Sequence, residues 1–354
     1  MWGRWRSALL TVCLLTAVSA GCSRTAAQDS ALAPARAASP GQRAASGPAT
    51  SRGGPASVLP PAATGTASAS EAVAAGRPLP SATARGLPAG VFYLLAGPTL
   101  ADLNVWQIGP GGDQRRLTSS HRGYGIDGFA VSRAGLILAA GDHLARWTRH
   151  GPSWLRSRGA LIRGSSPDIR ANGMIGYVTP PARDGTGRAA QFAIWVRPCC
   201  RGRGAVVRRQ TRAVTGPVFG PHGQLAVQGF ASQAGRPAPA LLIYRHGDSR
   251  KLRTGVPAIP SLLAWGEHAP GVAVAFPSHV AELLYPGGGR QLLPRGWQPL
   301  AWNPDGTRLL MQSGAALGVW SAKTPSQVTR IGGITPGVQI LQATWLARPA
   351  PLPQ

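Results

Sequence analysis

From residue 91 onward, the chain alternates short apolar runs with turn residues, and no stretch has the spacing of an amphipathic helix. The clearest unit is Leu300–Leu310, in which an apolar run ending at Trp302 meets a turn and is followed by a second apolar run. Pro304 presets φ in this turn, and Gly306 accepts the positive φ that closes it. The pattern predicts two antiparallel strands joined by a tight turn.

Looser copies of this unit recur along the chain. Gly216–Val227 keeps the aromatic residue, the Pro-x-Gly turn and the apolar run, and Gly128–Leu138 keeps the aromatic residue, a glycine and the run. Successive copies lie 40, 50, 46, 37 and 43 residues apart when they are aligned on the bulky residue that ends the first run. A period of about 40–50 residues with four short strands per unit is typical of a β-propeller. The six aligned residues, called repeat anchors below, are Phe129, Ile169, Phe219, Trp265, Trp302 and Trp345.

The last copy, Ile340–Leu346, is a half unit followed by too few residues for another blade. The first blade, which begins at Val91–Leu95, lacks an innermost strand because residues 80–90 are rich in Pro, Gly and Ala. We therefore expect the C-terminal strand to enter the first blade and close a ring of six blades, which removes the exposed edges of an open array. The predicted fold is an all-β, six-bladed β-propeller over residues 89–349, with residues 350–354 as a tail.

The N-terminus predicts export. Arg4 and Arg6 precede an apolar run, Ala8–Val18, that is too short to span a bilayer, and small residues then lead to Cys22. This order resembles the bacterial lipoprotein signal, in which the cysteine receives a diacylglycerol thioether. We expect a signal peptide over residues 1–21, lipidation of Cys22, and anchoring at the extracytoplasmic face of the cell membrane. The alternative is ordinary secretion with Cys22 as a free thiol.

The segment 22–88 has a composition of its own. After the cysteine it consists almost entirely of Ala, Ser, Pro, Gly, Thr and Arg, and it has no aromatic residue. Such a segment cannot bury enough apolar surface to offset the entropy of ordering. We expect a disordered tether between the lipid and the propeller.

The repeat resembles that of TolB-type six-bladed propellers, in which a strand ending in an aromatic residue or serine is followed by Pro-Asp-Gly and an apolar strand. The match is close at Trp302–Leu310 and moderate at Phe219–Val227, and the resemblance spans most of residues 90–347. It implies the propeller fold and a scaffold or binding role on the envelope side of the membrane. It does not imply the partners of TolB, because the tether stands here in place of the small α/β domain that precedes the propeller in that family.

The net charge of +25 is carried by 35 arginines and two lysines, Lys251 and Lys323. So basic a chain suggests nucleic acid or an anionic surface as a partner. The arginines are scattered through the repeats, however, and together with abundant Ala, Gly and Pro they are typical of GC-rich coding. We expect no specific nucleic-acid partner, and only non-specific attraction to anionic polymers of the envelope.

No G-x-S-x-G, phosphate-loop, H-E-x-x-H or C-x-x-C motif occurs, so the sequence nominates no catalytic residue, cofactor or metal ligand. The adjacent Cys199 and Cys200 are expected to form a vicinal disulfide or an inert loop, and a redox or metal role is the alternative. Asp168 and Asp305 are expected to hold turns through hydrogen bonds to the backbone.

These observations favour a monomeric binding or scaffold module for an envelope protein or glycan. Binding usually resides in loops on a rigid scaffold, and segments 180–190, 197–204 and 231–239 are long insertions in blades three and four. The alternative is a propeller enzyme, a hydrolase or lyase, with its site at the mouth of the channel. Convergence of at least two carboxylates would favour the enzyme, and the candidates are Asp127, Asp168, Glu267 and Asp305.

Overall fold

The computed structural model describes residues 87–118, 125–179, 191–198, 204–210, 216–245, 248–254, 262–276 and 280–352. All of the described residues belong to one unit of the chain, Thr64–Gln354. The predicted signal peptide, Cys22, most of the tether, and the pair Cys199 and Cys200 lie outside the described residues. The described residues form strands and two short 3-10 turns.

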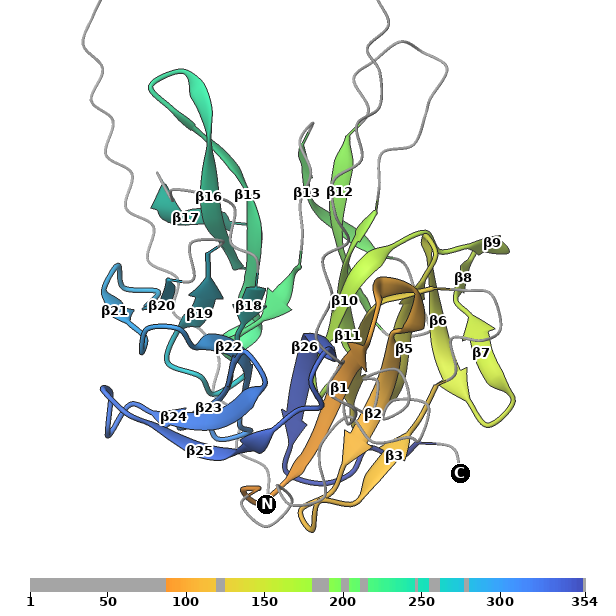
Figure 1. Ribbon diagram of the computed structural model, residues 1–354. Coiled ribbons are helices and arrows are strands. Elements are labelled where there is room, and N and C mark those ends of the chain that lie inside the picture. Colours follow the sequence, from red (N-terminus) through yellow and green to blue (C-terminus); the bar gives the residue numbers. More distant parts are fainter. Residues whose placement is uncertain are drawn as a thin grey trace, which may run out of the picture. The chain divides into compact units, whose positions relative to one another are not determined.

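Six four-stranded antiparallel sheets form the blades of a propeller (Figure 1). Blade one contains β26 (Gln339–Leu346), β1 (Val91–Gly97), β2 (Asn104–Ile108) and β3 (Gln114–Arg116). Blade two contains β4 (Ile126–Ser132), β5 (Gly135–Ala140), β6 (His143–Thr148) and β7 (Gly151–Trp154). Blade three contains β10 (Ser165–Ile169), β11 (Met174–Thr179), β12 (Phe192–Pro198) and β13 (Ala205–Gln210).

The second half of the ring repeats this order. Blade four contains β14 (Val218–Phe219), β15 (Leu225–Gln233), β16 (Arg236–Arg245) and β17 (Asp248–Thr254). Blade five contains β18 (Leu262–Ala264), β19 (Val272–Ala275), β20 (Ala281–Leu284) and β21 (Arg290–Leu292). Blade six contains β22 (Gln298–Trp302), β23 (Arg308–Ser313), β24 (Ala316–Ser321) and β25 (Val328–Gly333). The predicted six-bladed fold is confirmed.

The ring is closed by the C-terminal strand, as the sequence predicts. β26 pairs antiparallel with β1 in a register that runs from Val91 opposite Leu346 to Gly97 opposite Gln339, with one bulge. The ring of Trp345 lies 4.7 Å from that of Phe92, centroid to centroid. Blade one thus obtains its innermost strand from the far end of the chain, and this strand pairs with the edge of β1 that would otherwise be open.

The chain remains packed after β26. The backbone N–H of Ala350 donates to the hydroxyl of Tyr93 over 2.8 Å, and both residues are buried. Ala350 belongs to an apolar cluster that Tyr93 of blade one shares with Phe129 of blade two. The residues after the last strand therefore brace the joint between the first two blades.

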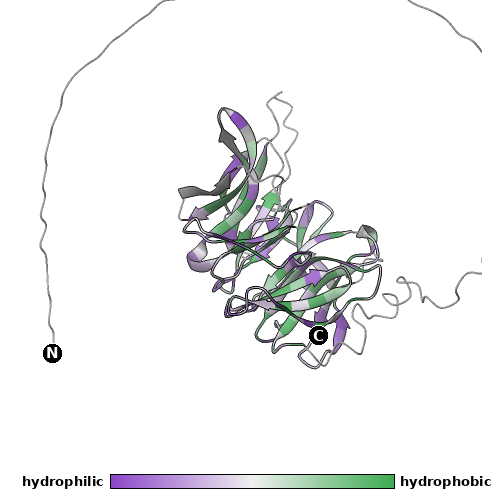
Figure 2. Ribbon diagram, turned by 60° about the vertical axis from the view of Figure 1, so that its left-hand side comes forward, coloured by the Kyte–Doolittle hydropathy of each residue, from purple (hydrophilic) through white to green (hydrophobic). Residues whose placement is uncertain are grey.

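Adjacent blades pack through apolar side chains on both faces of their sheets. In β1, Val91, Tyr93 and Leu95 pack toward blade two. The alternate residues Phe92, Leu94 and Ala96 pack toward blade six. Because side chains alternate along a strand, a strand buried on both faces must be apolar throughout, which explains the unbroken apolar run of β1. Figure 2 shows the apolar residues concentrated along the strands.

Two features depart from the sequence predictions. Residues 231–239 are predicted to be a loop, but β15 and β16 continue through them as a paired ribbon that turns at Ala234 and Gly235. Figure 1 shows this ribbon projecting beyond the rest of blade four. A second hairpin, β8 (Arg156–Ser157) and β9 (Ala160–Leu161), lies between blades two and three and has no counterpart in the predicted repeat. Segment 180–190 and residues 199–203 lie outside the described residues.

Candidate functional site in the central channel

The innermost strands of all six blades line one pocket of about 440 Å³ on the axis of the propeller. The pocket extends from these strands to the turns that follow them, where Arg133, Arg170, His268, Pro304 and Arg348 lie. Each blade contributes the end of its innermost strand, and every blade except blade four also contributes the start of the turn that follows that strand. The pocket is therefore a direct product of the repeat.

The repeat anchors lie on or directly after the innermost strands. Five of the six line the pocket, and Phe129 does not. Their side chains are at most 8% exposed, and Trp265 and Trp302 belong to the apolar cluster that joins blades four, five and six. The aromatic anchors therefore stabilise the joints between blades.

Asp168 also lines the pocket. Its carboxylate accepts hydrogen bonds from the backbone N–H of Ile169 over 2.9 Å and from that of Phe219, in blade four, over 2.6 Å. Burial raises the pKa of Asp168 from 3.8 to about 6; the two N–H bonds oppose this shift, and the nearby carboxylate of Glu267 adds to it. Asp168 thus joins two blades and titrates close to neutrality.

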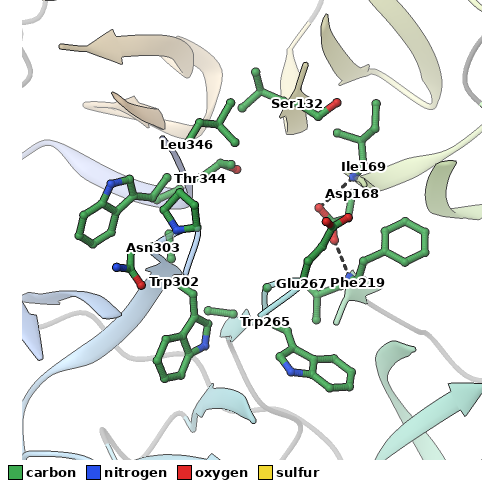
Figure 3. Close-up of a pocket in the computed structure, with 18 of the residues that line it drawn as sticks. Ser132, Asp168, Ile169, Phe219, Trp265, Glu267, Trp302, Asn303, Thr344 and Leu346 are labelled. Carbon is green, nitrogen blue, oxygen red and sulfur yellow. Dashed lines mark hydrogen bonds between the residues drawn. The ribbon is translucent and has the colours of Figure 1, made fainter. Parts of the chain in front are cut away.

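Glu267 reaches the same wall of the pocket from blade five. Its carboxylate accepts a hydrogen bond from the backbone N–H of Ala171 over 3.1 Å and lies 3.4 Å from the Nε of Arg170, both in blade three. The guanidinium of Arg170 lies 5.8 Å from the centre of the Phe219 ring. Figure 3 shows the carboxyl groups of Asp168 and Glu267 side by side. The contacts connect three consecutive blades at one wall.

The other two candidate acids do not join this pair. Asp127 and Asp305 are exposed and lie outside the pocket lining. The turn that contains Asp305 is held mainly by Asn303, whose side-chain oxygen accepts from the backbone N–H groups of Thr307 and Arg308 over 2.9 and 2.8 Å. The prediction that Asp305 holds this turn through bonds to the backbone is therefore wrong, because the side chain of Asn303 already fills that role. Among the described residues, Asp305 accepts only from the hydroxyl of Thr307.

Sequence reasoning missed several residues that shape the channel. Gln342 of β26 accepts from the backbone N–H of Phe129 over 3.0 Å and donates to its carbonyl over 2.6 Å, which joins blade one to blade two. Arg170 was likewise not nominated. Gln342 lies in the last repeat copy, Ile340–Leu346, but the repeat is defined by its apolar and turn positions, which do not mark a polar side chain between them. Within the described part of the chain, no three His, Cys, Asp or Glu side chains come together as a metal site would require. In that same part, no helix has the length and hydropathy needed to span a membrane.

The fold has several counterparts among solved structures. A chain of a nidogen/laminin complex has a TM-score of 0.55 and 13% sequence identity, covering 74% of this chain and 100% of that one. TolB from Acinetobacter baumannii has a TM-score of 0.54 and 11% identity, covering 74% of this chain and 67% of that one. A putative TolB from Agrobacterium tumefaciens has a TM-score of 0.50 and 11% identity, covering 73% of this chain and 98% of that one.

The likeness to TolB proteins bears out the resemblance that the repeat carries, and at these identities it concerns the fold alone. No protein-family model matches the sequence. No curated protein matches it either. The residues of the pocket must therefore carry any functional conclusion.

Proposed function

We propose that this protein is a lipid-anchored, extracytoplasmic binding module whose ligand, a protein or glycan of the cell envelope, enters the channel pocket. The observation that carries the proposal is that all six blades contribute to one pocket. A concave site on a rigid scaffold, with apolar walls and a few converging polar groups, is the usual form of a binding site. The solved nidogen/laminin structure, whose fold is similar, is a protein–protein complex and supports a protein as the ligand.

Site-specific photo-crosslinking in intact cells tests the binding role. A photo-reactive residue replaces His268 or Arg348, two exposed residues of the pocket lining. The matched control replaces Leu292, which is 65% exposed on the outermost strand of blade five. We expect the same partner to be captured from both pocket positions and not from Leu292. Equal capture from Leu292, or none from the pocket, would refute channel binding.

The anchoring part of the proposal rests on the order of residues that ends at Cys22. Replacing Cys22 with Ala removes the thiol that would carry the lipid, so the protein should move from the membrane fraction to the soluble fraction. Unchanged retention of the Cys22→Ala variant in the membrane fraction would point to an uncleaved apolar segment instead.

The convergence of Asp168 and Glu267 favours a second candidate, a hydrolase or lyase acting in the channel. A carboxyl group whose pKa is raised to about 6 beside a second carboxylate can serve as a proton donor or acceptor near neutral pH. Incubating the purified protein with envelope glycans tests this candidate, with Asp168→Asn as the inactivated variant. Turnover that disappears in that variant would establish the enzyme, and equal turnover by both proteins would assign the activity to a contaminant.

A further inference from the structure

The acidic wall of the pocket is unusual in a chain with 12 acidic and 37 basic residues. Two of those acids, Asp168 and Glu267, lie together at one wall of one pocket. Glu267 is paired with Arg170. Among the described residues, Asp168 has no basic side chain within ion-pair distance, and its only hydrogen bonds come from two backbone N–H groups. A partly buried carboxylate without a cation is costly, and a cation brought by a ligand would offset that cost.

The remaining lining of this wall restricts the form of the cation. Val218, Leu263 and Ala264 line the pocket in blades four and five, the same blades that supply the N–H of Phe219 and the carboxylate of Glu267. Arg133 and Arg348 are exposed, and they contribute to the lining from blades two and one. A small free cation would gain nothing from the apolar walls. A cation at the end of an aliphatic stem gains apolar contact along the stem, and this contact offsets part of the repulsion by the arginines.

We infer that the pocket takes a basic side chain, a lysine or an arginine of a partner protein, with its charged end against Asp168 and Glu267 and its stem along the apolar wall. This inference rests on the proposed function, because it names the group by which the partner enters the channel. It favours a protein over a glycan, since an amino sugar has no aliphatic stem to place along Val218 and Leu263.

A pair of short peptides tests the inference without knowledge of the partner. The first is acetyl-Gly-Lys-Gly-amide, and the second carries norleucine, which keeps the stem and lacks the ammonium group. Binding to the full chain is measured by calorimetry or NMR at physiological salt. We expect the lysine peptide to bind about tenfold to a hundredfold more tightly than the norleucine peptide, the range of a charge-assisted hydrogen bond. Glucosamine serves as the probe for an amino sugar.

Variants test whether Asp168 and Glu267 cause the preference for the lysine peptide. Asp168→Asn and Glu267→Gln should each remove most of the preference for lysine. Asp113→Asn is the control, because it makes the same change of charge at an exposed carboxylate outside the pocket lining and should keep the preference. The unaltered chain provides a second measurement, since its affinity for the lysine peptide should rise as the pH passes through about 6 and Asp168 ionises.

Three results would overturn the inference. They are equal affinity for the two peptides, absence of saturable binding by either, and a preference for lysine that survives both pocket variants. Tighter binding of glucosamine than of the lysine peptide would also overturn it and indicate a glycan. None of these outcomes affects the crosslinking result. Binding of a partner in the channel and recognition of a basic side chain by the pocket can therefore be refuted independently.

Discussion

The turn glycine Gly306 connects the repeat to the packing of the ring. It has φ of +70°, and a Cβ built there would lie 2.1 Å from the backbone carbonyl oxygen of His268 and 2.3 Å from its carbon. Those atoms belong to the corresponding turn of blade five, so the Pro-Asp-Gly turn of blade six rests directly on its neighbour. Replacing Gly306 with Ala therefore tests how tightly two blades are joined.

The expected magnitude has two parts. Alanine at positive φ costs about 1–2 kcal/mol, and its lower entropy in the unfolded chain returns about 0.4–1 kcal/mol. The contact with backbone atoms of His268 cannot be relieved by rotating a side chain, so the turn must shift, at a cost of about 1–3 kcal/mol. Gly314 provides the matched control, since it has φ of +54° and a Cβ added there would have no heavy atom within 4 Å. Gly314→Ala should therefore show the first part alone.

Urea unfolding of the full chain, followed by tryptophan fluorescence and by circular dichroism, measures the difference. We expect Gly306→Ala to lower the free energy of unfolding by about 1–3 kcal/mol more than Gly314→Ala, with an unchanged slope in urea. Coincident transitions from the two probes are required for this comparison. Equal destabilisation by the two substitutions would show that the contact between blades five and six accommodates an added methyl group at little cost. That result would refute tight packing of the Gly306 turn against His268.

Three further predictions concern closure and charge. Deleting residues 339–354 removes β26 and unpairs β1, so melting should lose its cooperativity or the protein should aggregate, and a truncated chain of unchanged stability would contradict the observed closure. Tyr93→Phe leaves the buried N–H of Ala350 without its acceptor and should lower the free energy of unfolding by about 1–3 kcal/mol in urea, whereas no change would show that water replaces the hydroxyl. Because burial raises the pKa of Asp168 from 3.8 to about 6, the folded chain binds this proton more tightly than the unfolded chain; its contribution to stability is full below pH 3.8 and is lost as the pH rises through about 6, by up to about 3 kcal/mol. Urea titrations between pH 3.8 and pH values above 6 should show this loss of stability in the unaltered chain and not in the Asp168→Asn variant. The same dependence of stability on pH in both proteins would contradict the raised pKa of Asp168.

The sequence predicted the parts of the fold that are encoded locally. The turn at Gly306 and the apolar runs on either side of it specify a hairpin without reference to the rest of the chain, and repetition of that unit predicts blades. Closure by β26 was also predictable, because an unpaired half unit at one end matched a missing strand at the other. The hairpin of β8 and β9 was not predictable, since it follows no repeat.

The site was harder to predict because its contacts join distant residues. Asp168 and Phe219 are 51 residues apart, and Glu267 and Ala171 are 96 apart. No local pattern encodes these pairs, since they depend on how blades are rotated about the common axis. The sequence nominated Asp168 and Glu267 together with Asp127 and Asp305, which do not join them. Only the assembled ring distinguishes the two pairs.

Closure by the last strand also sets the order in which the protein can fold during synthesis. Val91 emerges early, yet its partner Leu346 is translated 255 residues later. At about 5–20 residues per second, that interval lasts on the order of 10–50 s, during which blade one has no innermost strand and the apolar face of β1 that packs toward blade six is uncovered. Burial of this face must wait for the C-terminal end of the chain, so a chain interrupted during synthesis keeps an unpaired strand edge and an exposed apolar face at blade one. Proteases and chaperones that recognise exposed apolar strands could thereby separate unfinished chains from finished ones.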